Sequence, residues 1–270
     1  MFPWVDGFHW TVMHVVFLTI FGLVLVTVAT TFLWSLFRTA GDLRSQRAAQ
    51  LCWRNNFAQL PEAQRHCRHE LSGRVIHRIC PNAFDCRHCE LYEAFAAMPF
   101  PVRTLNTGVE YSDKLLYHRG HTWVLPEADG TFTVGLDEFA HHLIGQPDKL
   151  NFPRKGADIQ TEGIAWRMTK NGHEIRVRAP LDGTILATGG PQYRWYLRVK
   201  PRGPVDLRHL LQGPEVAGWL ASEADRLQIQ LRQPGSEPAL ADGGTLMPEL
   251  MDNLPHANWD EVLSDTFLDA

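Results

Sequence analysis

The segment WRMTKNGHEIRVRAP, residues 166–180, decides the fold of the β-rich part of this chain. Apolar and polar residues alternate on both sides of Asn171-Gly172, as is typical of two β-strands that are buried on one face. Asn-Gly is also the dipeptide that two-residue type I′ hairpin turns favour. The segment therefore predicts a β-hairpin that turns at residues 171 and 172.

This turn fixes which residues lie opposite each other in the hairpin. The pairs expected on the apolar face are Lys170–His173, Met168–Ile175, Trp166–Val177 and Ile164–Ala179. The pairs expected on the other face are Thr169–Glu174, Arg167–Arg176 and Ala165–Arg178. A slip by one residue would move the apolar set into water, so the sequence determines the register well.

The chain begins with an apolar segment. Residues 11–37 contain no Asp, Glu, Lys or Arg, and this length is sufficient for a helix to cross a bilayer core of roughly 30 Å. The segment lacks the basic start of a secretory signal, so we predict a retained single-pass anchor. Arg38, Arg44 and Arg47 follow it closely, and basic residues stay on the cytoplasmic side. We therefore expect a bacterial inner-membrane protein whose C-terminal domain is cytoplasmic.

All five cysteines lie between residues 52 and 89. A cytoplasmic location makes a disulfide framework unexpected, because thiols there are kept reduced. Cys67, Cys80, Cys86 and Cys89 could close a four-thiolate metal site, whereas Cys52 is farther away. Their spacing matches neither a common zinc ribbon nor a ferredoxin pattern, so zinc, an iron–sulfur cluster and unmetallated thiols all stay open.

A set of short motifs between residues 117 and 190 resembles the H-protein of the glycine cleavage system. The motifs are His121 and Trp123, GTFTVG at 130–135, HHLIG at 141–145, Gly156, Gly163, and Ala179-Pro180 with Gly183. The resemblance implies a barrel-sandwich hybrid of the lipoyl type. The apolar anchor and the cysteine segment lie outside it, and the whole is similar to membrane-anchored bacterial variants with an N-terminal cysteine cluster.

The fold class we expect is α+β. The expected segments are a short extracytoplasmic end (1–10), a transmembrane helix (11–37), a helical, cysteine-rich metal-binding segment (38–98), a linker (99–116), the barrel-sandwich hybrid (117–204), C-terminal helices (205–232) and an acidic tail with a short terminal helix (233–270). Residues 205–231 carry an apolar stripe at helical spacing, which we expect to pack on the β unit. Most of the tail should be solvated.

The H-protein family carries lipoate on one lysine at the apex of this hairpin. Here Asn171 and Gly172 occupy the apex, and Lys170 falls one position before the turn, on the apolar face. We therefore do not expect lipoate. Lys170 is the residue that would carry it if the arm were functional, since no other lysine falls in the hairpin.

Two sets of residues are predicted to mediate interactions. Arg167, Arg176 and Arg178 are expected on one face of the hairpin, where opposed like charges repel unless an acidic partner or the protein's own tail covers them. Trp259, Val262, Leu263 and Phe267 share one face of the terminal helix, which could pack on its own domain or dock on a partner subunit.

Neither the composition nor the motifs indicate an enzyme. The formal net charge of −4 gives no reason to expect nucleic acid binding, and we see no catalytic triad, paired carboxylates or phosphate loop. We expect a non-catalytic accessory or adaptor subunit of a membrane complex, which contacts the lipid bilayer and other protein subunits. The alternatives are an iron–sulfur electron-transfer subunit of a respiratory assembly and a membrane-bound lipoyl carrier that uses Lys170.

Overall fold

The computed structural model describes residues 9–98, 109–231 and 246–269. The backbone contacts divide the chain into two compact units, Met1–Ala48 and Ala49–Ala270. The cysteine-rich segment therefore shares a compact unit with the β-strands. Most of the expected extracytoplasmic end (1–8), most of the expected linker (99–108) and the first part of the acidic tail (233–245) lie outside the described residues.

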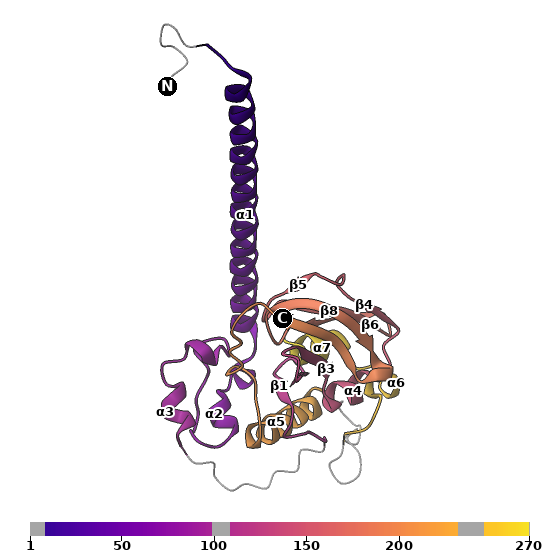
Figure 1. Ribbon diagram of the computed structural model, residues 1–270. Helices are drawn as coiled ribbons and strands as arrows, with labels where there is room; N and C mark the ends of the chain where they lie inside the picture. Colours follow the sequence, from indigo (N-terminus) through magenta and orange to yellow (C-terminus); the bar gives the residue numbers. More distant parts are fainter. Residues whose placement is uncertain (1–8, 99–108, 232–245, 270) are drawn as a thin grey trace. The chain divides into compact units, whose positions relative to one another are not determined.

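The chain combines helices with antiparallel strands, which confirms the α+β class (Figure 1). The α-helices are α1 (Val12–Gln59), α2 (Arg68–Leu71), α3 (Tyr92–Ala96), α4 (Glu138–Ile144), α5 (Pro214–Leu231), α6 (Leu250–Asn253) and α7 (Trp259–Thr266). Short 3₁₀ helices are η1 (Glu62–Gln64), η2 (Cys86–His88) and η3 (Pro191–Tyr193). The strands are β1 (Leu116–His118), β2 (Thr122–Pro126), β3 (Phe132–Leu136), β4 (Lys149–Asn151), β5 (Asp158–Ile159), β6 (Ile164–Lys170), β7 (His173–Arg178), β8 (Gly183–Gly190) and β9 (Trp195–Pro201).

The N-terminal part of α1 is long and apolar enough to cross a membrane. This part, Val12–Arg38, has 27 residues and a mean hydropathy of 2.5, and none of its most apolar window is buried. Its threonine hydroxyls are satisfied within the helix. Thr19, Thr27 and Thr31, for example, donate to the carbonyls four residues earlier at 2.7–3.0 Å. A segment in lipid must pair its polar groups in this way, because no water is present to do so.

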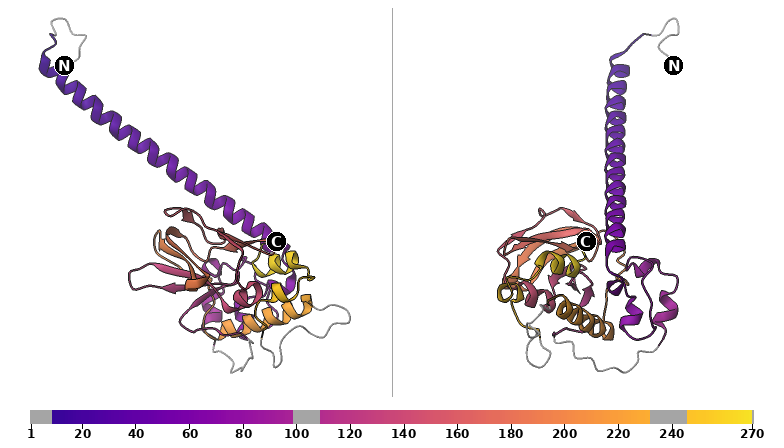
Figure 2. Two further views of the ribbon diagram at one scale, coloured as in Figure 1. Left: turned by 90° about the vertical axis from the view of Figure 1, so that its right-hand side faces the viewer. Right: turned by 180° about the vertical axis from the view of Figure 1, so that it is seen from behind.

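The strands form two antiparallel sheets. The larger sheet has six strands in the order β1-β2-β3-β9-β8-β5, and the smaller has three in the order β4-β6-β7. The larger sheet is curved into a half-barrel, and Figure 2 shows the strands of both sheets from two further sides. Trp166 of β6 stacks on Tyr196 of β9, with ring centroids 5.1 Å apart and planes at 6°. Both rings are 1% exposed, so this contact joins the two sheets through a buried core.

The hairpin of β6 and β7 has the expected register near its turn. The five pairs from Lys170–His173 to Trp166–Val177 are confirmed. The two outer pairs are wrong. A β-bulge between Ile164 and Trp166 places Ile164 opposite Arg178, and the amide of Ala179 donates instead to the carbonyl of Gly163 at 2.8 Å. A bulge adds one residue to one strand, which shifts every pair beyond it.

Helix α5 covers the β unit with the C-terminal part of the predicted apolar stripe, whereas residues 205–213, which were also expected to be helical, form no helix. Its side chains Val216, Trp219, Leu220 and Leu227 are at most 1% exposed. The other side of α5 meets the cysteine-rich segment, because a Cβ at Gly218 would come within 2.0 Å of the carbonyl oxygen of Leu71 in α2. Glycine therefore permits the close approach between α5 and α2.

Candidate functional site

The tip of the hairpin is a two-residue turn at Asn171 and Gly172. Both residues have positive φ, at 50° and 86°, as a type I′ turn requires. Both are exposed. The summit of the hairpin therefore carries an amide side chain and a glycine, and no amine.

Lys170 lies beneath this turn and is bound on both sides. Its residue is 6% exposed, and its ammonium donates to the carbonyl of Gln146 at 3.1 Å and to Oδ2 of Asp252 at 2.6 Å. The same carboxylate accepts a bond from the Asn171 side chain at 3.1 Å. Hydrogen bonds from Lys170 and Asn171 hold the pKa of Asp252 below its usual value, so the carboxylate stays charged. The lysine that could carry a prosthetic group is thus covered by the C-terminal segment.

Asp252 belongs to α6, in the part of the tail that was expected to be solvated. That expectation is wrong for the apolar side chains around α6, whereas the last residues, from 258, were expected to form a helix. Leu250 and Met251 are 0% exposed, and α6 packs against α4. An acidic composition predicted solvation, but Leu246, Leu250 and Met251 are buried in the core that also contains the strands.

The terminal helix α7 also packs within the chain. Its predicted interaction residues Trp259, Leu263 and Phe267 are 3%, 4% and 0% exposed. His173 of the hairpin reaches this helix through a 2.6 Å contact between its Nδ1 and the Asp260 carboxylate. Of the two alternatives for this apolar face, the structure places it on the chain's own domain, where it is buried from any partner.

The arginines of the hairpin meet the same C-terminal segment. Arg176 lies 3.1 Å from Oδ2 of Asp269, and Glu174 contacts both Arg176 and Arg167, at 3.1 and 3.7 Å. These contacts provide the negative charge that two opposed arginines need. Arg167 and Arg176 keep about half of their side-chain surface, at 49% and 47% exposure.

The prediction that Arg178 lies on the exposed face of the hairpin is wrong. It is 4% exposed, and its guanidinium donates to the carbonyl of Leu268 at 2.7 Å and to that of Glu162 at 2.9 Å. It also lies 5.3 Å from the ring centre of Trp53. The bulge at the base of the hairpin and the C-terminal segment together bury this side chain, so it holds the tail in place.

His121, the first residue of the H-x-W motif, is fully buried. Its ring stacks between Phe139 and Trp219, at centroid distances of 4.5 and 4.8 Å. Its Nδ1 lies 2.8 Å from Asp137 and its Nε2 lies 3.7 Å from Glu223. Burial lowers the pKa of His121, but the two carboxylates outweigh burial and raise it to about 9. His121 is thus an internal cation that ties α5 to the β unit.

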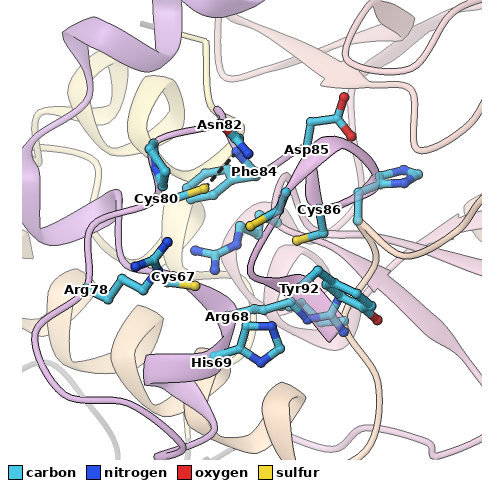
Figure 3. A pocket seen from close by; sticks show the side chains of 15 residues that line it. Cys67, Arg68, His69, Arg78, Cys80, Asn82, Phe84, Asp85, Cys86 and Tyr92 are labelled. Atoms are coloured by element: carbon cyan, nitrogen blue, oxygen red, sulfur yellow. Dashed lines mark hydrogen bonds between the residues drawn. The ribbon is translucent and has the colours of Figure 1, made fainter. Parts of the chain in front are cut away.

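Four of the five cysteines line one cavity in the second unit (Figure 3). They are Cys67, Cys80, Cys86 and Cys89, the residues that the sequence groups into a metal site. The sulfur atoms of Cys67, Cys80 and Cys86 point toward the same space in Figure 3. Cys52 is exposed and does not line the cavity. Among the described residues, no group of three or more His, Cys, Asp or Glu side chains is arranged to hold a single metal ion.

The backbone explains how these cysteines come together. Cys67 donates its amide to the carbonyl of Arg78 and Cys80 donates to that of Arg65, both at 2.7 Å, so two chain segments pair with the cysteines near each other. Cys86 opens η2, whose N-cap Asp85 accepts a bond from the amide of Arg87 at 3.2 Å. The 3₁₀ turn places Cys89 one turn after Cys86.

Basic side chains line this cavity. Arg68, Arg78 and Arg119 are among its lining residues, together with His69. Burial lowers the pKa of His69 to about 4, and the neighbouring Arg68 adds to this effect, so His69 is neutral at pH 7. Burial also raises the pKa of the Cys86 thiol to about 11 and lowers that of Arg119. Burial thus favours the neutral thiol of Cys86, which lies in a cavity lined by three arginines.

Two residues important to these sites escaped the sequence reasoning. Asp252 lies in a segment too short to show helical periodicity, although its acidic character beside Leu250 and Met251 is a weak signal. Arg119 is far from the cysteines in sequence and reaches them only through the fold. No local pattern could have identified it.

The comparisons with known proteins point to one class. No family model matches the chain. The glycine cleavage system H protein of Neisseria gonorrhoeae is 29% identical over 118 residues, which cover 39% of this chain and 89% of that protein. The one of Ralstonia nicotianae is 32% identical over 124 residues, covering 41% and 93%. A crystal structure of such a protein from Mycobacterium marinum aligns at 20% identity with a TM-score of 0.34, covering 40% of this chain and 97% of that one.

The curved sheet, the small sheet with its hairpin and these matches define an H-protein-like domain of the lipoyl type. The chain belongs to the family of glycine cleavage system H proteins through this domain, which accounts for about 40% of its length. The apolar helix and the cysteine segment are additions to that domain.

Proposed function

We propose that this chain is a membrane-anchored adaptor subunit whose H-protein-like domain binds another protein and carries no lipoate. The apolar helix supports anchoring in the bacterial inner membrane, and the arginines after the span favour a cytoplasmic domain. The domain is non-catalytic and serves as a docking module within a membrane complex.

The environment of Lys170 is the observation that carries this proposal. A carrier arm needs a lysine whose amine stands free at the tip of the hairpin. Here the amine is buried and bound by Gln146 and Asp252, and the tip is Asn171-Gly172. The domain has the fold of a lipoyl carrier, but Lys170 is not presented at the tip of the hairpin. This combination favours a role in protein binding.

A membrane-bound lipoyl carrier is the alternative. In that function, Lys170 would leave both of its partners and its side chain would swing out past the turn. The ion pair opposes this movement, because it would take the ammonium donor away from the carbonyl of Gln146 and leave the Asp252 carboxylate with the Asn171 amide but no cation. This alternative is therefore the less favoured one.

The outer face of the hairpin is the surface proposed for the partner. Arg167 keeps 49% of its side-chain surface, and its one ion pair among the described residues is the 3.7 Å contact with Glu174. An acidic surface on a partner subunit could therefore reach this arginine without disturbing the packed core. Arg176 beside it is also half exposed.

Affinity isolation of the full chain in mild detergent tests the proposal. We expect a partner protein in stoichiometric amount, and Arg167→Glu should reduce its recovery because the substitution repels an acidic surface. Lys155→Glu is the matched control, since it reverses a charge at another exposed position. Recovery of the chain alone, or equal losses in both variants, would contradict the proposed docking role.

A further inference from the structure

The cavity lined by cysteines is a feature that the adaptor role does not use. Four of the five cysteines surround it, although they come from different parts of the segment between residues 67 and 89. The fifth, Cys52, lies outside and is exposed. Four sulfurs around one enclosed space are the ligand set of zinc sites and of iron–sulfur clusters.

The buried guanidinium of Arg119 favours binding of an anionic group in the cavity. Arg119 is 8% exposed and stacks on Phe84, with its guanidinium carbon 3.9 Å from the ring centre. Within the described residues, no carboxylate lies at ion-pair distance from Arg119, whereas Arg68 is paired with Glu215. A buried charge is costly unless it is paired. The thiols of Cys67, Cys80 and Cys86 are close enough to act on Arg119 electrostatically, so they would pair with it once deprotonated by a metal.

The arrangement of the cysteines favours a cluster over a single ion. Zinc draws each thiolate to about 2.3 Å from one centre. The described residues contain no group so arranged. The four cysteines instead line a common cavity of about 20 Å³. Four cysteines that line one cavity without closing on a single centre fit a cluster, which takes one thiolate on each iron, better than they fit one zinc ion.

We propose that this cavity holds an iron–sulfur cluster ligated by Cys67, Cys80, Cys86 and Cys89. Binding is a ligand exchange on a preformed cluster: each thiol gives its proton to solvent, and its sulfur replaces one external ligand on iron. No atom changes oxidation state in this step. Arg119 lies beside the cluster and balances its negative charge, so it is a positioning residue and not a ligand.

The first test is metal analysis of the full chain purified without oxygen in mild detergent. We expect iron and acid-labile sulfide in equal and stoichiometric amounts, with broad visible absorption. Cys86→Ser and Cys89→Ser should bring both to background, whereas Cys52→Ser should leave them unchanged. Stoichiometric zinc without sulfide, absence of both metals, or equal iron in the Cys86 and Cys52 variants would overturn the proposal.

A second variant separates ligation from folding. Arg119→Gln keeps all four thiols, and we expect it to hold the cluster at a more negative reduction potential, because a nearby cation favours the reduced form. An unchanged potential would remove Arg119 from the site. This proposal does not depend on the adaptor role. If affinity isolation recovers no partner protein, the expected iron content is unchanged. If the chain contains no iron, the expected mass of the polypeptide without lipoate is also unchanged.

Discussion

The ammonium of Lys170 lies 2.6 Å from Oδ2 of Asp252, a residue 82 positions later in the chain. This pair connects the hairpin to the C-terminal segment. It also withdraws the lysine from the tip at which a lipoyl carrier would present it. The C-terminal segment thereby acts as a cover for the hairpin.

Asp252→Asn is expected to expose Lys170. The substitution removes the charged partner and leaves a buried ammonium, which should cost about 1–3 kcal/mol of unfolding free energy. Labelling of Lys170 by an amine-reactive reagent should rise, as read by peptide mass mapping. Asp260→Asn is the matched control, because that carboxylate is 84% exposed and its loss should cost about 1 kcal/mol or less. Equal labelling in both variants would contradict the covering role.

The stability of the second unit should depend on His121 above pH 6.5. Its folded pKa of about 9 exceeds the ordinary 6.5, so its contribution is fully present below pH 6.5 and is lost as pH rises through 9. The loss between these values should be on the order of 3 kcal/mol. We expect the wild type to lose more stability than His121→Gln over this interval, measured by urea unfolding and tryptophan fluorescence. Parallel pH profiles of the two proteins would contradict this prediction.

Glu215→Gln should weaken the attachment of the cysteine-rich segment to α5. Glu215 and Arg68 are each 4% exposed in their side chains and form a buried ion pair, which Arg74 joins at 3.5 Å. Removal of one partner from a buried pair costs about 3–5 kcal/mol. Urea unfolding measures the loss, and Glu93→Gln, at an 82% exposed position, is the control. A loss below that of the control would mean that the pair contributes nothing.

The sequence is sufficient to predict the centre of the hairpin but not its base. Asn171-Gly172 and the alternation around it determine five pairs correctly. The bulge near Ala165 cannot be predicted from the sequence. Ile164, Ala165 and Trp166 are all apolar, so the pattern does not show where the alternation is interrupted. Its consequence is the burial of Arg178, which depends on contacts with Leu268 and Glu162 far along the chain.

The same distinction holds for the two candidate sites. Cysteine spacing alone grouped four residues and set Cys52 apart, and these four do line one cavity. Arg119 and Asp252, which supply the charges at the two sites, arrive through tertiary contacts. Local sequence patterns predict helices, strands and nearby ligand groups. They do not predict which charged residues from distant segments pair in the folded protein.

The intact mass of the full chain, produced in a host that lipoylates its own H protein, tests the central claim most directly. The host's H protein serves as the positive control for lipoylation. We predict that this chain has its unmodified mass, because its hairpin tip carries Asn171-Gly172 and Lys170 is bound beneath it. A mass increase equal to one lipoyl group that disappears in Lys170→Arg would contradict the account.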